Sequence, residues 1–281
     1  MKIFREPKKL QSWCAARRME GRRIALVPTM GYLHEGHLSL IAEAKRRGAE
    51  EIVVSVFVNP VQFGPNEDFD KYPRDEKADL AKCRVAGATA VFFPTPANMY
   101  LDAHSVYVNE ESLSKGLCGA RRPGHFRGVC TVVAKLFNLV HPHFAVFGQK
   151  DFQQAAVIRR MVRDLNFDLD VIVAPIVREP SGLARSSRNT YLSDDERERA
   201  CALSQALFAA ADAVKTAKSL PWKAERAKIV RRLKKAGLVV DYVEAVDGET
   251  LESVDRLEKG VAVLLAVYCG KTRLIDNAVM R

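Results

Sequence analysis

The first part of the chain alternates short, β-rich apolar runs with helical patterns, and this alternation constrains the fold more than any other feature. Residues 24–29 (IALVPT) and 51–58 (EIVVSVFV) are nearly continuous in apolar residues and rich in Val and Ile, which is typical of strands buried on both faces. Residues 90–94, 144–148 and 168–176 have the same character. Strands that alternate with helices predict a parallel sheet covered on both faces. We therefore expect an α/β fold with a Rossmann-like core.

Three helices are expected between these strands. The first begins near Gly36 and runs to about Arg47. The second covers 127–140 and carries one apolar stripe, made of Val129, Val132, Val133, Leu136 and Val140. The third follows Asp151, and its apolar residues at helical spacing predict an inward face of Ala155, Ile158, Val162 and Leu165.

The sequence changes character after about residue 176, which predicts a second, smaller α/β domain. Residues 179–193 form a loop rich in Gly, Ser, Arg and Asn. Two polar helices should follow, the first with Ser193 as its N-cap and acidic residues in its first turn, where the helix dipole favours them. Three short strands come last. We expect the two domains at residues 1–176 and 177–281.

Composition excludes several classes of protein. The 281 residues are 48% hydrophobic and 28% charged, which is typical of a soluble globular protein, and no apolar run is long enough to cross a membrane. The N-terminal segment has no apolar stretch of signal-peptide length, so the cytoplasm is the expected location. The six cysteines form no C-x-x-C pair or zinc pattern, and we interpret them as reduced thiols.

The net charge of +10 is spread along the chain. The densest basic stretch, 223–237, has apolar residues at helical intervals. The solvated face of a surface helix is therefore the favoured interpretation, and nucleic-acid binding is the weaker one. A basic field also suits an enzyme that collects anionic substrates. We expect small-molecule partners, with no nucleic acid and no membrane.

The motif PTMGYLHEGHLSLI at 28–41 follows a predicted strand and opens a predicted helix. Gly31 and Gly36 let the backbone approach a ligand, and a helix that begins near Gly36 offers free N–H groups to an anion. His34 and His37 are three residues apart and can face one phosphate. This H-x-G-H pattern resembles that of the nucleotidyltransferase superfamily, whose imidazoles stabilise charge at the α-phosphorus. A structural histidine pair is the alternative interpretation.

Two further loops follow predicted strands at the carboxyl edge of the sheet, where open α/β folds bind ligands. In FVNPVQFGPNEDFDKYPRD, Asn59 and Gln62 suit hydroxyls and a carboxylate, although Asn-Pro alone also marks an ordinary turn. In FGQKDFQQ, Lys150 lies beside a predicted helix start. Gln154 follows one helical turn later, so both side chains can face one cavity. A solvated Lys150 is the alternative.

Two loops rich in Gly and Arg complete the set of motifs. GLCGARRPGHFRGV can present Arg121, Arg122, His125 and Arg127 to an anion, or these side chains can simply be solvated. GLARSSRNTYLS can wrap a triphosphate with hydroxyl and guanidinium groups. A flexible interdomain linker is the alternative interpretation of this loop.

Together and in this order, these five motifs resemble the pantothenate synthetase (pantoate–beta-alanine ligase) family over most of residues 24–193. The resemblance implies a Rossmann-like domain that binds nucleotide and pantoate, a C-terminal lid domain, and a cytoplasmic homodimer. It also implies ATP-dependent ligation of (R)-pantoate and beta-alanine to pantothenate through a pantoyl-adenylate, with release of AMP and pyrophosphate. Mg²⁺ would act together with ATP, and the resemblance leaves its protein ligands open.

The resemblance further implies a set of site residues. His37, His34 and Lys150 would be catalytic. Gln62 and Gln154 would bind pantoate, and Gln62 would also bind beta-alanine. The ATP contacts would come from Met30, Gly31, His34, Gly36, His37, Gly148, Gln149, Lys150, Asp151, Val177, Arg185, Ser186, Ser187 and Arg188.

Two positions depart from the usual pattern of the family. Ser181 stands where the family commonly has Asp, and Arg185 stands where it commonly has an apolar residue. Two rival functions also stay open at this point. A nucleotidyltransferase would need a site for an acceptor phosphate, whereas Asn59 and Gln62 better suit a hydroxy acid. An RNA-binding module built on the basic C-terminal helices would leave the His, Lys and Ser-Arg motifs unexplained.

Overall fold

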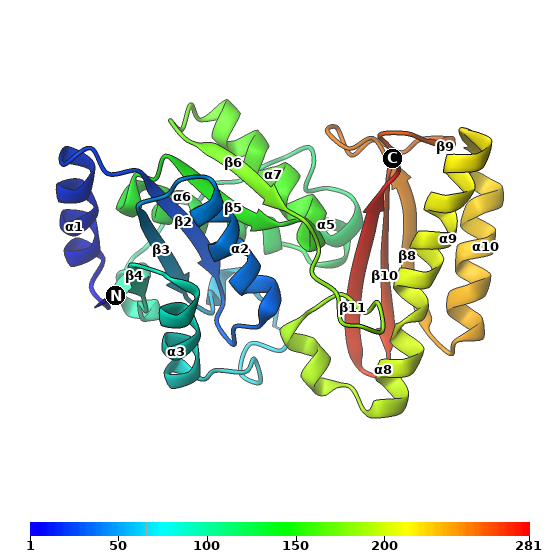
Figure 1. The fold of residues 1–281 in the computed structure, drawn as a ribbon, viewed down its shortest axis with the longest axis horizontal. Helices are drawn as coiled ribbons and strands as arrows, with labels where there is room; N and C mark the ends of the chain where they lie inside the picture. Colours follow the sequence, from blue (N-terminus) through cyan, green and yellow to red (C-terminus); the bar gives the residue numbers. More distant parts are fainter. Residues whose placement is uncertain (66) are drawn as a thin grey trace. The chain divides into compact units, whose positions relative to one another are not determined.

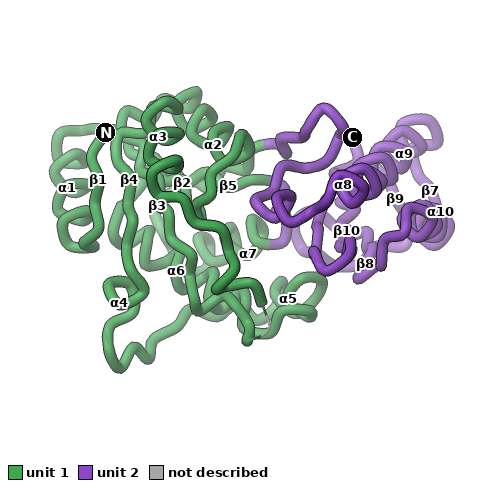
Figure 2. Tube along the Cα trace, turned by 90° about the horizontal axis from the view of Figure 1, so that it is seen from below, with its two compact units in different colours: residues 1–148, 154–174 green, residues 149–153, 175–281 purple. Residues whose placement is uncertain are grey.

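The computed structural model describes residues 1–65 and 67–281, which form two compact units (Figure 2). The first unit contains Met1–Gly148 and Gln154–Ala174. The second contains Gln149–Gln153 and Pro175–Arg281. A five-residue stretch between two segments of the first unit therefore belongs to the second.

The first unit is built on a six-stranded sheet whose neighbouring strands are all parallel, in the order β1-β4-β3-β2-β5-β6 (Figure 1). The strands are β1 Lys2–Phe4, β2 Ile24–Thr29, β3 Glu51–Val56, β4 Ala90–Phe92, β5 Phe144–Gly148 and β6 Asp170–Ala174. The chain order reverses at β2, which lies between β3 and β5, and open α/β sheets bind ligands outside the carboxyl ends of such strands. The predicted parallel α/β core is confirmed.

Helices cover both faces of this sheet. On one face, α2 (Glu35–Arg46) packs on β2, β3 and β5 and contacts α3 (Glu76–Ala86). On the other face, α1 (Pro7–Met19) and α6 (His125–Val140) contact each other and β2. The remaining elements of the first unit are the 3-10 turn η1 Pro60–Gln62 and the helices α4 Pro96–Met99, α5 Leu117–Arg121 and α7 Phe152–Asp164, the last of which belongs to this unit from Gln154 onward.

The ends of α3 follow directly from the sequence. The Asp75 carboxylate caps the helix by accepting a hydrogen bond from the N–H of Ala78 at 2.9 Å. Gly87 ends it in the left-handed conformation, with a φ of 93°. The buried positions of α3 are Cys83 and Asp79, one helical turn apart. An acid therefore occupies the buried stripe of this helix.

The predicted inward residues were correct for α6 and only partly correct for α7. All five residues of the predicted α6 stripe are buried. In α7, Ala155 and Ile158 are buried and Val162 is half-buried, whereas Leu165 is 51% exposed. Leu165 is exposed because α7 ends at Asp164, one residue before the apolar pattern does.

The second unit has a three-stranded antiparallel sheet in the order β11-β10-β8. Its strands are β8 Val239–Val246, β10 Ala262–Cys269 and β11 Thr272–Val279, with a separate antiparallel pair of β7 Ser219–Pro221 and β9 Arg256–Glu258. Its other elements are α8 Asp194–Ala200, α9 Ala202–Ala217, α10 Trp222–Lys235, η2 Gln149–Asp151 and η3 Ser187–Tyr191. The helices α9 and α10 pack on the sheet to form the core of this unit.

The expectation of two polar helices in this region was wrong, because there are three. The helix α8 starts at the predicted N-cap, Ser193, whose Oγ accepts a hydrogen bond from the N–H of Glu196 at 3.3 Å. A break at Cys201 separates α8 from α9, and α9 is a core helix with a continuous buried face. In the part of the chain that the structure describes, no helix is long and apolar enough to span a bilayer.

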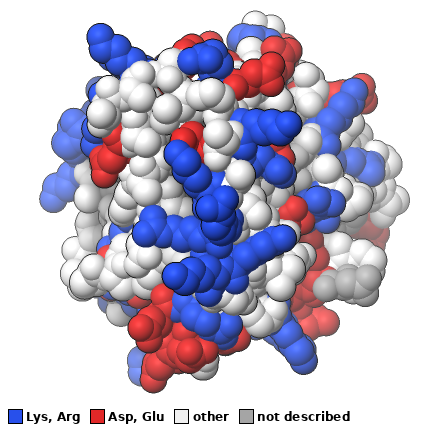
Figure 3. All heavy atoms as spheres, turned by 90° about the vertical axis from the view of Figure 1, so that its right-hand side faces the viewer, with Lys and Arg blue, Asp and Glu red and all other residues white. Residues whose placement is uncertain are grey.

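The basic stretch forms α10, which buries only one stripe, made of Trp222, Glu225, Ile229 and Leu233. Its lysines and arginines are exposed. Figure 3 views this side of the second unit, where Lys and Arg side chains gather with acidic side chains among them. Arg226 lies 3.6 Å from Glu244, and Lys228 lies 2.6 Å from Glu225. The interpretation of this stretch as the solvated face of a surface helix is confirmed.

Candidate functional site

The H-x-G-H loop follows β2, and its backbone conformation is tightly constrained. Gly31 has a φ of 84°, and a Cβ placed there would lie 2.8 Å from Val56 Cγ1 and 3.0 Å from Asp79 Oδ2. Only glycine combines this conformation with so close a contact. Tyr32 also has a positive φ, of 51°. The structure therefore requires glycine here for the turn and for close packing against Val56 and Asp79, while the predicted approach of the backbone to a ligand stays a prediction.

Asp79 on α3 holds this loop, and the sequence did not single it out. Its two carboxylate oxygens accept hydrogen bonds from the N–H groups of Tyr32 (2.8 Å) and Leu33 (2.7 Å). Lys82 Nζ, also on α3, donates to the carbonyl of Leu33 at 2.6 Å. Burial raises the pKa of the Asp79 carboxyl, and the two backbone donors oppose that shift. The available sequence signal was an acid at a buried position of an amphipathic helix.

The two histidines lie together at the start of α2. His34 is the N-cap, and its Nδ1 accepts a hydrogen bond from the N–H of Gly36 at 3.1 Å. His37 Nδ1 accepts from the N–H of His34 at 3.2 Å. A ring nitrogen that accepts a hydrogen bond carries no proton, so in the neutral ring the proton is on Nε2. The two ring centroids are 4.1 Å apart, so the imidazoles lie side by side at the start of the helix.

Gln62 is fixed by a chain of side-chain hydrogen bonds on the turn η1. Tyr100 OH donates to Asn59 Oδ1 at 2.7 Å, which sets the orientation of the Asn59 amide. Asn59 Nδ2 then donates to Gln62 Oε1 at 3.0 Å. Because the Gln62 oxygen is engaged, this side chain presents its Nε2, which lies 3.2 Å from Met30 Sδ. The predicted residues Gln62 and Met30 are thus brought together, while Tyr100 was missed by sequence reasoning.

The R-P-G-H-F-R-G motif supports the Gln62 turn from behind. His125 Nδ1 lies 2.9 Å from the carbonyl oxygen of Gln62, and Arg122 Nη1 lies 2.9 Å from His125 Nε2. Arg122 also forms a two-point ion pair with Glu67, at 2.7 and 2.6 Å. A Cβ on Gly128 would lie within 2.5–2.6 Å of the backbone of η1. Arg122, His125 and Gly128 therefore brace the turn through protein contacts.

The turn η2 carries Gln149, Lys150 and Asp151, directly after β5 ends at Gly148. Lys150 is half-buried and Asp151 is exposed. Asn277 on β11 donates to the main-chain oxygens of Gln149 and Lys150, each at 3.0 Å. Gln154, on α7, is half-buried and belongs to the first unit. The structure thus places the predicted residues of this motif on a braced turn and the helix that follows it.

The loop at residues 179–193, called the Ser-rich loop below, is anchored at its start by a small hairpin. Arg185 N–H donates to the Val177 carbonyl at 2.9 Å, and Arg178 bridges to Ala184. Ser186 Oγ accepts from the N–H of Arg188 at 3.3 Å. The predicted loop residues Val177, Arg185, Ser186 and Arg188 are half-buried, and Ser187 is buried.

The two unusual positions are accommodated within the same hairpin. Ser181 Oγ accepts a hydrogen bond from the N–H of Leu183 at 3.4 Å, a turn contact that an Asp carboxylate can also make. Arg185 Nη1 lies 3.7 Å from Glu179 Oε1. Glu179 in turn accepts two hydrogen bonds from Arg197, at 2.8 and 2.9 Å. Neither Ser181 nor Arg185 disturbs the backbone pairing of the hairpin.

Comparisons with known proteins agree with these motifs. The family model described as pantoate-beta-alanine ligase matches residues 2–279. The pantothenate synthetase of Anaeromyxobacter dehalogenans is 56% identical, with 98% of this chain and 97% of that protein covered. That of Myxococcus xanthus is 53% identical, with 95% and 92% covered.

Solved structures resemble the chain over its whole length. The pantothenate synthetase of Thermus thermophilus has a TM-score of 0.90 at 41% identity, covering 100% of this chain and 99% of that one. The pantoate-beta-alanine ligase of Francisella tularensis, complexed with beta-gamma ATP and beta-alanine, has a TM-score of 0.83 at 31% identity, covering 100% and 98%. The chain therefore belongs to the pantoate-beta-alanine ligase family.

Proposed function

We propose that this chain joins (R)-pantoate to beta-alanine with ATP, through a pantoyl-adenylate. The observation that carries this proposal is the pair of imidazoles at the start of α2, each of which accepts a backbone N–H at Nδ1, so that in the neutral rings the proton is on Nε2. Family membership identifies the reaction, and this geometry supplies groups suited to its first step. A pantoate carboxylate oxygen attacks the α-phosphorus of ATP, the bond to the bridging oxygen breaks, and pyrophosphate leaves. The amine of beta-alanine then attacks the acyl carbon, and AMP leaves.

The side chains divide between stabilising charge and orienting the acid. We assign His37 and His34 to the phosphates, because preorganised donors at a developing charge contribute most to such transfers. Lys150 is assigned to an ATP phosphate as a point charge. Gln62, whose Nε2 end is presented, is assigned to a pantoate oxygen and to the beta-alanine site. Gln154 is assigned to pantoate.

The remaining predicted ATP ligands are assigned by motif position. They are Met30, Gly31, Gly36, Gly148, Gln149, Asp151, Val177, Arg185, Ser186, Ser187 and Arg188. We propose residues 1–176 as the domain that binds nucleotide and pantoate and 177–281 as the lid domain. The units of the structure differ from this division because Gln149–Gln153 and residues 175–176 belong to the second unit.

An acyl-thioester route is disfavoured by the cysteines. Burial raises the pKa of the Cys14, Cys83 and Cys130 thiols to about 12, so these thiols are protonated near neutral pH. A protonated thiol is a poor nucleophile. These three buried thiols are therefore poorly suited to carry an acyl group, which is consistent with activation of the pantoate carboxylate as a mixed anhydride with AMP.

Mg²⁺ is expected to bind to the phosphates of ATP and to have few direct protein ligands. Residues 1–65 and 67–281 contain no group of three His, Cys, Asp or Glu side chains arranged to hold a metal. Mg²⁺ usually keeps several waters and binds through substrate phosphates with few protein ligands. We therefore propose that Mg²⁺ enters together with ATP.

Two further properties are proposed on the family resemblance. We propose a homodimer, which sedimentation velocity at micromolar concentration would test against a monomer. We also propose a cytoplasmic location, and the six free cysteines support it, because thiols stay reduced in that compartment. Small molecules alone are proposed as partners, without nucleic acid or membrane.

The test of the adenylate is exchange of label from pyrophosphate into ATP, with each component omitted in turn. We expect exchange that depends on pantoate and Mg²⁺ and needs no beta-alanine, because the first half-reaction should run alone. Added beta-alanine should drain the intermediate and yield AMP and pantothenate. Exchange that strictly requires beta-alanine would refute a free-standing adenylate step, and exchange supported by a different acid would overturn the substrate.

A further inference from the structure

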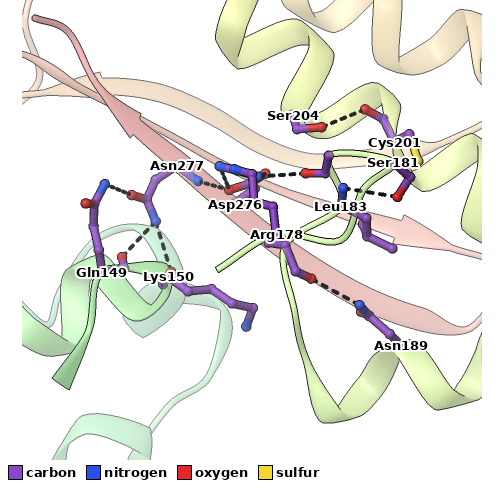
Figure 4. A network of polar contacts seen from close by, with 12 residues as sticks. Gln149, Lys150, Arg178, Ser181, Leu183, Asn189, Cys201, Ser204, Asp276 and Asn277 are labelled. Carbon is purple, nitrogen blue, oxygen red and sulfur yellow. Dashed lines mark hydrogen bonds and ion pairs between the residues drawn. The ribbon is translucent and has the colours of Figure 1, made fainter. Parts of the chain in front are cut away.

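Asn277, on the edge strand β11, is buried, and its side-chain amide forms hydrogen bonds with the turn η2 (Figure 4). It is 2% exposed. Its Nδ2 donates to the main-chain oxygens of Gln149 and Lys150, each at 3.0 Å. Its Oδ1 accepts from Gln149 Nε2 at 3.2 Å. The amide thus uses both donors and its acceptor on two consecutive residues of η2.

Asn277 is itself held in place by its neighbour on β11. Asp276 Oδ1 accepts a hydrogen bond from the N–H of Asn277 at 2.8 Å. The two Asp276 oxygens also accept from the guanidinium of Arg178, at 2.7 and 2.9 Å, and Arg178 Nη1 donates to the Gly182 carbonyl at 3.1 Å. Two-point pairs of this kind fix geometry as well as adding energy. The dipeptide Asp276-Asn277 therefore links η2 with the hairpin that begins the Ser-rich loop (Figure 4).

We propose that Asn277 is a positioning residue for Lys150: by holding the main chain of η2, it fixes the point from which the ammonium group reaches an ATP phosphate. The proposal rests on the proposed function of Lys150. In Figure 4 the Lys150 side chain extends away from the Asn277 amide, so Asn277 acts on its backbone. A lysine side chain is long and flexible, and its reach is defined only as well as its Cα is.

The Asn277 variants should show this role in kinetics. Asn277→Ala removes both donors, and Asn277→Asp places carboxylate oxygens against two carbonyl oxygens. In the ATP–pyrophosphate exchange assay at saturating pantoate, kcat/KM for ATP should fall roughly tenfold to a hundredfold in Asn277→Ala and further in Asn277→Asp, as for small misplacements of a catalytic group. The KM for pantoate should change by less than about threefold, because Asn277 forms its side-chain hydrogen bonds with Gln149 and Lys150 and shares none with Gln62 or Gln154.

A double mutant separates positioning from general destabilisation. If Asn277 acts through Lys150, then adding Asn277→Ala to Lys150→Ala should lower exchange by no more than about twofold, because coupled residues are not additive. The control is Asp241→Asn on β8, which removes the negative charge that pairs with Arg273 of β11 at 2.9 Å and leaves the contacts of Asn277 with η2 unchanged. This control should lower Tm and leave the ATP kinetics unchanged.

Each alternative outcome overturns the proposal in a recognisable way. Asn277 variants whose ATP kinetics match those of Asp241→Asn would show a structural role only, as would full additivity with Lys150→Ala. Normal exchange by Lys150→Ala would refute the phosphate role of Lys150 and the positioning role with it. If Asn277→Asp does not fold, the Asn277→Ala comparison carries the same decision.

Discussion

Each imidazole of the H-x-G-H loop accepts a backbone hydrogen bond at Nδ1. At His37, substitution can therefore distinguish the structural role of Nδ1 from the catalytic role proposed for Nε2. His37→Asn retains an acceptor near the position of Nδ1 for the His34 N–H but has nothing at the position of Nε2. His37→Ala lacks both. We expect both variants to lose on the order of a hundredfold in exchange rate, because each loses one preorganised donor. Only His37→Ala should also lose stability, by about 1 kcal/mol for a capping bond.

Steady-state exchange kinetics and urea unfolding of the two variants make this comparison. Near-normal exchange by His37→Asn would show that Nε2 is not the working atom. Equal loss of stability in both variants would show that Asn does not preserve the cap.

Arg185 tests whether a family-atypical cation matters to ATP. Its side chain is 33% exposed and lies 3.7 Å from Glu179, which already has closer contacts with Arg197. A partly exposed pair of this length contributes about 1 kcal/mol or less. We expect Arg185→Met to change the KM for ATP by less than roughly tenfold, measured in the exchange assay. A collapse of activity would identify Arg185 as a direct phosphate ligand.

At the scale of elements, the close contact of α6 with η1 depends on Gly128, which has no side chain. A Cβ on Gly128 would lie 2.5 Å from the Val61 carbonyl oxygen and 2.6 Å from the Gln62 backbone nitrogen. Because these are backbone atoms, Gly128→Ala should displace the turn that carries Gln62. Overpacking of this kind costs about 1–3 kcal/mol. We expect the KM for pantoate to rise more than the KM for ATP.

Gly116→Ala is the matched control for this substitution. Gly116 has a φ of −95°, and a Cβ there meets nothing within 4 Å. Steady-state kinetics and thermal unfolding should find this control close to the unmodified chain. Unchanged pantoate kinetics in Gly128→Ala would show that η1 can move without consequence for Gln62.

The sequence predicted those features that depend on neighbouring residues and missed those that depend on contacts between residues far apart in the chain. The strand β2 covers the same residues as the predicted run, and the H-x-G-H histidines do lie at the start of a helix, because apolar periodicity and cap chemistry act over a few residues. Asp79 contacts a backbone 46 and 47 positions earlier, and Asn277 contacts one 127 and 128 positions earlier. Such partners are set by strand order and packing, which no periodicity in one sequence encodes.

At the scale of the molecule, His143 ties three strands of the parallel sheet together. Its Nδ1 accepts a hydrogen bond from the Ile24 N–H at 3.0 Å, its N–H donates to the Ile24 carbonyl, and its carbonyl accepts from Asp170. Burial, together with the nearby Arg18, lowers the pKa of this imidazole. A histidine whose pKa is lowered on folding stabilises the protein above its unfolded pKa, and this stability is lost as pH falls through the folded pKa.

We therefore expect the free energy of unfolding to fall more steeply between pH 7 and pH 5 in the unmodified chain than in His143→Asn. The asparagine keeps an acceptor for the Ile24 N–H but does not titrate in this range. The difference should be about 1 kcal/mol at pH 5, the usual contribution of one hydrogen bond. Urea unfolding at several pH values measures it, and parallel pH profiles would contradict the assignment to His143.

The path of the chain between the two units limits how this protein can be truncated or recombined with its relatives. The chain leaves the first unit after Gly148, returns at Gln154 and leaves again after Ala174. A fragment that starts at Pro175 would carry β11 and its Asn277 without Gln149 and Lys150, the two residues with which this amide forms its side-chain hydrogen bonds. The second unit is therefore not one contiguous stretch of gene. A chimera that exchanges the second unit between relatives therefore has to include Gln149–Gln153 as a separate insert. Without this insert, Asn277 of the donor would face the corresponding five residues of the recipient.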